Sequence, residues 1–184
     1  LFLARDREIA EEAFPGDIVG IPNHGVLRIG DALTEGESLR FLGIPSFAPE
    51  LLQSVRSGDP MKAKHLEKAL NHFAEEGASK LFKPNVGSGW IVGVVGPLQF
   101  DVLASRIEQE YGLPVRFEPT QFTSARWLSG PRDRIDAFAK ANKGHMAEDH
   151  DGDPVYMTRL QWDIDRVARD WPELRLTATK EMHA

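Results

Sequence analysis

Two segments of the chain repeat apolar residues at intervals of three and four, the spacing that puts side chains on one face of an α-helix. These residues are Leu66, Leu70 and Phe73 in the first segment and Phe100, Leu103, Ile107 and Tyr111 in the second. Each segment lies between short apolar runs that are typical of β-strands. The order along residues 45–118 is therefore β-α-β-β-α-β. This order predicts a ferredoxin-like α+β sandwich, with two helices on one face of an antiparallel sheet.

Turn-forming residues indicate where both helices begin and end. Asp59 followed by Pro60 predicts an N-cap and the first position of the first helix, and Gly77 predicts its end. Pro97 opens the second helix and Gly112 ends it. The strands that these helices separate are predicted over residues 47–55, 79–82, 90–95 and 113–117.

Residues 1–44 have a β pattern without a helical period. Short apolar runs at 17–21, 26–29 and 39–42 are separated by turn residues, among them a Pro-Gly and an Asn-His-Gly. Three short strands cannot bury a core alone, so we expect the end of a larger β-barrel or a segment that packs on the rest. The first residue is leucine, and LFLAR at 1–5 reads as the middle of a strand. We therefore expect the chain to be part of a longer protein.

Residues 118–184 show the same alternation less clearly, without a strict sequence repeat. We expect strands over 125–128, 156–160 and 174–178 and helices over 133–142 and 163–171. AEDHDGD at 147–153 predicts an acidic, solvated loop. These elements are interpreted as C-terminal α+β additions to the ferredoxin-like core, within one domain that covers residues 45–184.

WIVGVVGPLQFD at 90–101 raises the question of a phosphate site, because a strand, a glycine turn and a helix N-terminus can cradle a phosphate. A phosphate loop of the Walker type needs G-x-x-x-x-G-K-[ST], and neither the lysine nor the hydroxyl is present. Pro97 also removes one backbone N–H. The stretch therefore predicts a tight turn before a helix.

Other motifs for catalysis or metal binding are missing or incomplete. The chain contains no cysteine, no H-E-x-x-H and no G-x-S-x-G. Asp149, Asp151 and Asp153 alternate as calcium ligands do, but Pro154 and Leu160 occupy the sixth and twelfth positions of that loop. We expect no catalytic residue, no cofactor and no metal site within these 184 residues.

The formal net charge of −6 does not predict binding to nucleic acid over the whole surface. Any such contact would be local. The candidate patches are Lys62, Lys64 and Lys68 on the first helix, and Arg126 with Arg132 and Arg134 near a loop. The alternative is that these side chains are only solvated. No apolar run approaches the ~20 residues that span a bilayer, and no secretory signal opens the chain.

Two stretches resemble translational GTPases. DREIAEEAFPGDIVGIPNHGVLRIGDALTEGE (6–37) is similar to the last part of their second, β-barrel domain, and its motif includes Gly16, Asp17, Gly30 and Asp31. FLGIPSFAPELLQSVRSGDPMKAKHLEKAL (41–70) and VGVVGPLQFDVLASRIEQEYGLPVRFEP (92–119) resemble the bacterial peptide chain release factor 3 family. Motif residues there, with structural roles expected, are Gly96, Pro97, Gln99, Phe100 and Asp101.

The resemblance implies a cytoplasmic GTPase that promotes dissociation of class I release factors from the ribosome after peptide release. GTP and magnesium would bind a preceding G domain, so this chain itself is not expected to be an enzyme. Residues 1–44 would be the end of domain II, an elongation-factor-type β-barrel, and 45–184 would be domain III. The implied partners are ribosomal protein and rRNA, the protein's own G domain and, indirectly, class I release factors. Contacts with the ribosome are expected at Lys62, Lys64, Lys68 and Arg126.

Two other interpretations stay open. The chain could be the equivalent region of elongation factor G or of a ribosome-protection protein, although those carry further domains after the third. It could also be a stand-alone ferredoxin-like module that senses a ligand, or an acylphosphatase-like enzyme. That enzyme needs a glycine-rich loop with a catalytic arginine near its first strand, and SGDP at 57–60 does not supply one.

Overall fold

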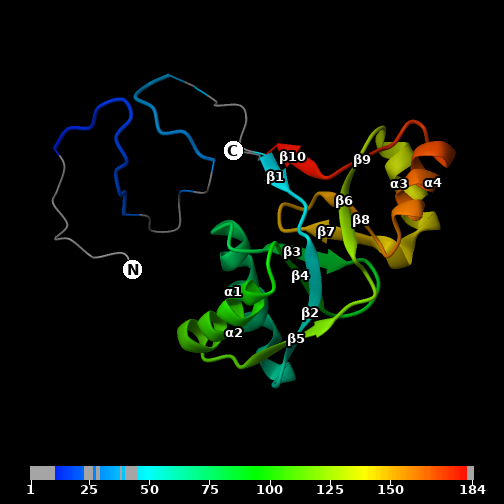
Figure 1. The fold of residues 1–184 in the computed structure, drawn as a ribbon, viewed down its shortest axis with the longest axis horizontal. Coiled ribbons are helices and arrows are strands. Elements are labelled where there is room, and N and C mark those ends of the chain that lie inside the picture. Colours follow the sequence, from blue (N-terminus) through cyan, green and yellow to red (C-terminus); the bar gives the residue numbers. More distant parts are fainter. Residues whose placement is uncertain (1–10, 23–26, 28–29, 38, 40–44, 182–184) are drawn as a thin grey trace.

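The computed structural model describes residues 11–22, 27, 30–37, 39 and 45–181. All of its helices and strands lie between Pro45 and Glu181, and eight of the strands form one sheet in the order β5-β2-β4-β3-β7-β8-β6-β9. Every strand pair in this sheet is antiparallel. Within the part of the chain that forms helices and strands, Figure 1 shows α1 and α2 on one side and α3 and α4 on the other.

The first half of the sheet is the predicted ferredoxin-like unit. Its elements are β2 (Leu51–Ser57), the 3₁₀-helix η1 (Pro60–Lys62), α1 (Ala63–Glu75), β3 (Lys80–Pro84), β4 (Trp90–Val94), α2 (Leu98–Tyr111) and β5 (Val115–Pro119). The strand order β5-β2-β4-β3 is 4-1-3-2 when the strands are counted within the unit. The predicted βαββαβ arrangement of residues 45–118 is confirmed.

The predicted C-terminal ends of both helices are confirmed, but each helix begins later than predicted, α1 at Ala63 after Lys62 as N-cap and α2 at Leu98 after Pro97 as N-cap. The side chain of Asp59 accepts a hydrogen bond from the backbone N–H of Met61 at 2.9 Å, and the 3₁₀ turn η1 precedes α1. Gly77 follows α1 at φ +70° and Gly112 caps α2 at φ +63°. Both glycines therefore have the left-handed backbone that ends a helix at little steric cost.

The strand predicted over residues 47–55 is wrong in one respect, because the structure divides it into β1 (Pro45–Phe47) and β2. Pro49 lies in the break and has no N–H to donate to a neighbouring strand. Its neighbours hydrogen-bond in two directions: the N–H of Ala48 donates to Ala178 O at 2.7 Å, and that of Glu50 donates to Val94 O at 3.0 Å.

The second half of the sheet is another βαββαβ unit, which the sequence predicted only as additional α+β elements. It consists of β6 (Ser124–Ser129), α3 (Arg132–Ala141), the 3₁₀-helix η2 (Lys143–His145), β7 (Met146–Asp149), β8 (Pro154–Thr158), α4 (Gln161–Asp170) and β9 (Arg175–Thr177). Its order β9-β6-β8-β7 is again 4-1-3-2. Within this unit the strand that the sequence did not predict is β7. Most of its residues lie in the stretch 147–153, which was predicted to be an acidic loop.

The two units join through their second strands. β3 pairs with β7, with Phe82 opposite Asp149 and Pro84 opposite Ala147. The strand order of the whole sheet is therefore symmetric about the β3–β7 pair. A third hydrophobic cluster, separate from the two under the helices, contains residues of both units, among them Phe82, Ile91 and Trp127. The units cannot separate without exposing this shared core.

Each pair of helices covers its own core. The buried side chains under α1 and α2 include Leu70, Phe73, Leu81, Val92 and Ile107. Those under α3 and α4 include Leu128, Phe138, Met146, Tyr156 and Val167. In the second core the ring centroid of Phe138 lies 5.3 Å from those of both Tyr156 and Trp171, in edge-to-face geometry.

A small second sheet joins the two ends of the folded region. β1 pairs with β10 (Thr179–Glu181), with Pro45 opposite Glu181 and Phe47 opposite Thr179 (Figure 1). This pairing links the segment that enters the first unit to the segment that leaves the second.

Lys180 of β10 is held by the three aspartates of the predicted acidic loop. Its Nζ lies 2.5 Å from Asp149, 2.7 Å from Asp151 and 2.7 Å from Asp153. Asp149 also accepts a hydrogen bond from Trp127 Nε1 at 2.9 Å. The solvated loop predicted at 147–153 is wrong for Asp149, which is 8% exposed. The ammonium group occupies the centre of the carboxylates, where the calcium interpretation would place an ion.

The electrostatic environment of Lys180 has two opposing effects on its pKa. Burial lowers the pKa, while the hydrogen bonds to Asp149, Asp151 and Asp153 raise it, and the net result is a pKa above the ordinary value. Burial lowers the pKa of the nearby Lys80, and the charge of Lys180 lowers it further.

Residues 11–22 and the other described positions before Pro45 contain no helix or strand. The strand predicted at 17–21 is therefore not formed, and Ile18 is fully exposed. A strand needs a neighbour to accept and donate its backbone hydrogen bonds, and no described residue pairs with this one. Most of the other two predicted strands, at 26–29 and 39–42, lies outside the described residues.

We predict that Gly93→Ala destabilises the protein by about 1–3 kcal/mol, because an added methyl group overpacks the core. A Cβ at Gly93 would lie 2.4 Å from Cγ of Pro49 and 3.2 Å from the ring of Phe82. Gly96→Ala is the matched control, since a Cβ there meets nothing within 4 Å. Urea unfolding should show a change within about 0.5 kcal/mol for the control. Equal stability of the two variants would contradict the packing argument.

We predict that Lys180→Met lowers stability by about 3 kcal/mol, because it leaves the buried carboxylate of Asp149 without its cation. The raised pKa of Lys180 means that its contribution is complete below pH 10.5 and disappears as the pH rises through the folded-state value. The difference between wild type and variant in urea unfolding should thus stay constant from about neutral pH to pH 10.5 and shrink above pH 10.5. Arg169→Met, which removes an exposed ion pair with Asp170, is the control and should change stability by less than about 0.5 kcal/mol.

Candidate functional site

The turn between β4 and α2 is closed by a side chain. Gln99 Oε1 accepts hydrogen bonds from the backbone N–H groups of Val95 at 2.8 Å and Gly96 at 2.9 Å. These are amides that a bound phosphate would use, and here they already have an acceptor. Pro97 is the N-cap residue of α2.

The other motif residues of this turn differ in burial. Phe100 is buried and its ring lies 5.0 Å from that of Phe117. Asp101 is exposed in the first turn of α2, where its negative charge complements the helix dipole. In this geometry Gln99 closes the turn and Phe100 packs in the core.

Gly16 and Asp17, two of the motif residues before Pro45, form part of a turn. Phe14 O accepts a hydrogen bond from the N–H of Asp17 at 2.9 Å, and Asp17 Oδ2 accepts one from the N–H of Phe14 at 2.8 Å. Gly16 has φ +101°. A positive φ at the third position of a four-residue turn favours glycine. Gly30 likewise has a positive φ of +100°, and Asp31 is exposed.

Three candidate lysines lie on η1 and the first two turns of α1. Lys62 ends the 3₁₀ turn, and Lys64 and Lys68 are one helical turn apart on α1. All three are exposed, whereas Leu66 and Leu70 of the same helix are buried. We call Lys62, Lys64 and Lys68 the α1 lysines.

The structure does not bring the candidate arginines together with the α1 lysines. Arg126 is half-buried on β6, in the second unit, and its Nη1 donates to Ala125 O at 2.8 Å. Arg134 on α3 lies 3.3 Å from Glu173 and 5.0 Å from the ring centroid of Trp171, so it takes part in packing within the second unit. Arg132 is exposed at the first position of α3.

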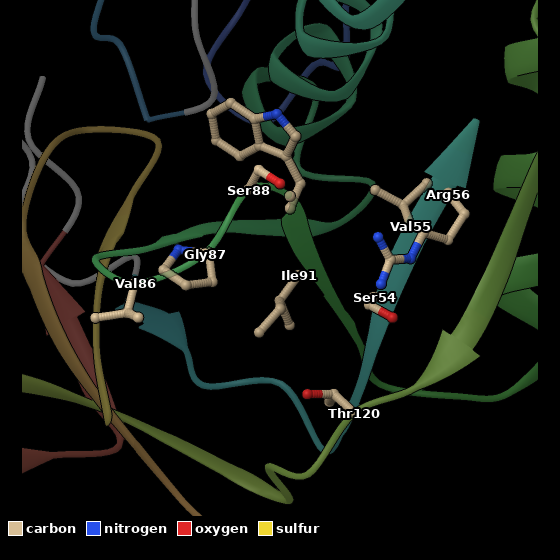
Figure 2. Close-up of a pocket in the computed structure, with 11 residues that line it drawn as sticks. Ser54, Val55, Arg56, Val86, Gly87, Ser88, Ile91 and Thr120 are labelled. Carbon is tan, nitrogen blue, oxygen red and sulfur yellow. The ribbon is translucent and has the colours of Figure 1, made fainter. Parts of the chain in front are cut away.

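A surface pocket of about 150 Å³ lies between β2 and the β3–β4 hairpin, and sequence reasoning missed it. Figure 2 shows Ser54 and Arg56 of β2 on one side, Val86 and Gly87 of the hairpin on the other, and Ile91 between them. Val55, Ser88 and Thr120 complete the labelled lining. The sequence signal that could have found it is VGSG at 86–89, a glycine-rich hairpin directly before Trp90.

Positive charge gathers around this pocket. Arg56 Nε lies 3.4 Å from Glu118, and both side chains are more than half exposed. Arg116 of β5 is directly opposite Arg56 in the β2–β5 register. Lys83 Nζ lies 5.5 Å from the ring centroid of Trp90, another lining residue.

Comparison with known protein families gives two matches in succession along the chain. Residues 1–36 match elongation factor G domain 2. Residues 41–168 match the C-terminal domain of class II release factor RF3. Among the described residues, no helix has the length and apolar character to cross a bilayer. The second match covers more than half of the 184 residues, and the chain therefore belongs to the release factor 3 family, as a region of a translational GTPase.

Proposed function

We propose that this chain is the ribosome-contacting region of a translation-termination GTPase that acts in the cytoplasm. The whole protein would promote GTP-dependent dissociation of class I release factors after the peptide has been freed. The observation that carries the proposal is the succession of the two family matches, a second domain of elongation-factor type followed by the C-terminal domain of a class II release factor.

In this proposal GTP and magnesium bind a G domain outside these residues, and this region is not itself catalytic. The closed turn at Gln99 supports this division of roles, because the amides nearest to a phosphate-loop arrangement already have an acceptor. The aspartates at 149, 151 and 153 are likewise held by Lys180.

The region would act as a rigid platform between the G domain and the ribosome. Two βαββαβ units share one sheet and one core, so bending between them would break the β3–β7 pairing and expose the cluster around Phe82 and Trp127. A rigid body of this kind transmits a rotation of one domain to a distant contact without absorbing it.

The α1 lysines are the contact surface that we propose for rRNA. The first turn of α1 contains no acidic residue. Cations near a helix N-terminus oppose the helix dipole, at a cost of about 0.3–1 kcal/mol each. A phosphate placed there would interact favourably with both the lysines and the dipole. The arrangement therefore favours an anionic partner over simple solvation.

We predict that replacing all three α1 lysines by glutamate in the intact factor weakens ribosome binding by about tenfold or more. The slope of log affinity against log salt should fall by roughly 0.7–0.9 for each phosphate that a lysine no longer neutralises. Lys140→Glu with Lys143→Glu is the control, since both lysines are exposed in the second unit. Unchanged binding and unchanged ribosome-stimulated GTP hydrolysis in a folded triple variant would refute this contact surface.

A further inference from the structure

We propose that the pocket between β2 and the β3–β4 hairpin binds one unpaired nucleotide of RNA, with the base in the pocket and the adjoining phosphate on Arg56 and Arg116. This proposal rests on the proposed function and names a second contact, separate from the α1 lysines. The pocket lies entirely within the first unit. It is lined by residues of β2 and β4, by the β3–β4 hairpin and by Thr120, which follows β5.

The arrangement of Arg56 and Arg116 indicates an anionic ligand. The two residues are directly opposite each other on neighbouring strands, and like charges in such a pair destabilise a sheet. Glu118, 3.4 Å from Arg56, is the one carboxylate found within 4.0 Å of either guanidinium among the described residues. The cluster therefore keeps an excess positive charge, which a phosphate would neutralise with the paired hydrogen bonds that arginine donates.

The size and lining of the pocket indicate a single flat ring. A volume of about 150 Å³ is below the roughly 300–1,000 Å³ of pockets that enclose whole small-molecule ligands. Ile91 is buried and Val86 is 57% exposed, so the pocket has an apolar wall that remains open to a ligand. The hydroxyl groups of Ser88 and Thr120 can donate to or accept from the edge of a base, and that of Ser54, which donates to Glu118 O at 3.2 Å, can accept.

The hairpin leaves room for a ligand to approach. Gly87 has φ +96° and Gly89 has φ +153°, and a Cβ added at either would meet nothing within 4 Å. The backbone of the hairpin is thus uncovered beside the pocket. A base that is stacked and paired in a duplex cannot enter such a recess, whereas the bases of RNA loops and bulges can be turned out into one.

The test measures binding of a fluorescent eight-nucleotide single-stranded RNA and of the matching duplex to the full 184-residue chain, by anisotropy at several salt concentrations. We expect the single strand to bind at least tenfold more tightly than the duplex. Arg56→Gln with Arg116→Gln should weaken single-strand binding at least tenfold and reduce the salt slope by roughly 0.7, because the one phosphate that both arginines hold is then left without a cation. Arg169→Gln, an exposed arginine of the second unit, is the control and should change neither quantity.

A second variant separates the base from the phosphate. Val86→Ser removes apolar surface without a change of charge, so it should weaken single-strand binding several-fold and leave the salt slope unchanged. Equal binding of duplex and single strand would overturn the proposal. Tighter binding of a poly-glutamate peptide than of the single strand would also overturn it, and so would equal effects of the pocket variants and the control. A failure of this proposal can be told apart from a failure of the proposed function. The pocket variants keep the α1 lysines, and ribosome binding by the whole factor is measured separately.

Discussion

The pairing of β3 with β7 is the interaction on which the rest of the structure depends. It converts two four-stranded sheets into one, and it places Asp149 at the end of β7 opposite Phe82 of β3. A carboxylate at that depth is stable only with partners, which Trp127 and Lys180 supply. Lys180 in turn belongs to β10, so the central strand pair, the shared core and the small β1–β10 sheet are stabilised together.

The parts of the fold that depend on local chemistry were predictable. The helical periods of α1 and α2, the cap at Asp59 and the glycine ends at Gly77 and Gly112 are contained in a few neighbouring residues. β7 was not, because its last residues, Glu148 and Asp149, begin an acidic stretch with the composition of a loop, and the cation that Asp149 contacts lies 31 residues later in the chain. β10 and the break at Pro49 in the strand predicted over 47–55 were also missed. Their hydrogen-bond partners are distant in sequence.

The candidate surfaces also differ in how far the sequence alone could predict them. Lys64 and Lys68 are one helical turn apart on α1, so their common exposure follows from the helix period, with Leu66 and Leu70 on the buried face. The pocket is different, because Arg56 and Arg116 are 60 residues apart and meet only through the β2–β5 register. A pattern search along the chain cannot detect such a pair. The contacts of Arg134 with Trp171 and Glu173 likewise join residues that are distant in sequence.

The β1–β10 pairing also has a consequence for how the protein is made. Pro45 faces Glu181, so β1 has no partner until the translating ribosome has released residue 181. The first unit can fold while the second is being synthesised, but the loop that closes at β1 spans most of the chain. Closing a loop of this length is slow compared with forming local contacts. Among the described strands β10 therefore emerges last and completes the fold, and a polypeptide interrupted before it would expose both Asp149 and the free edge of β1.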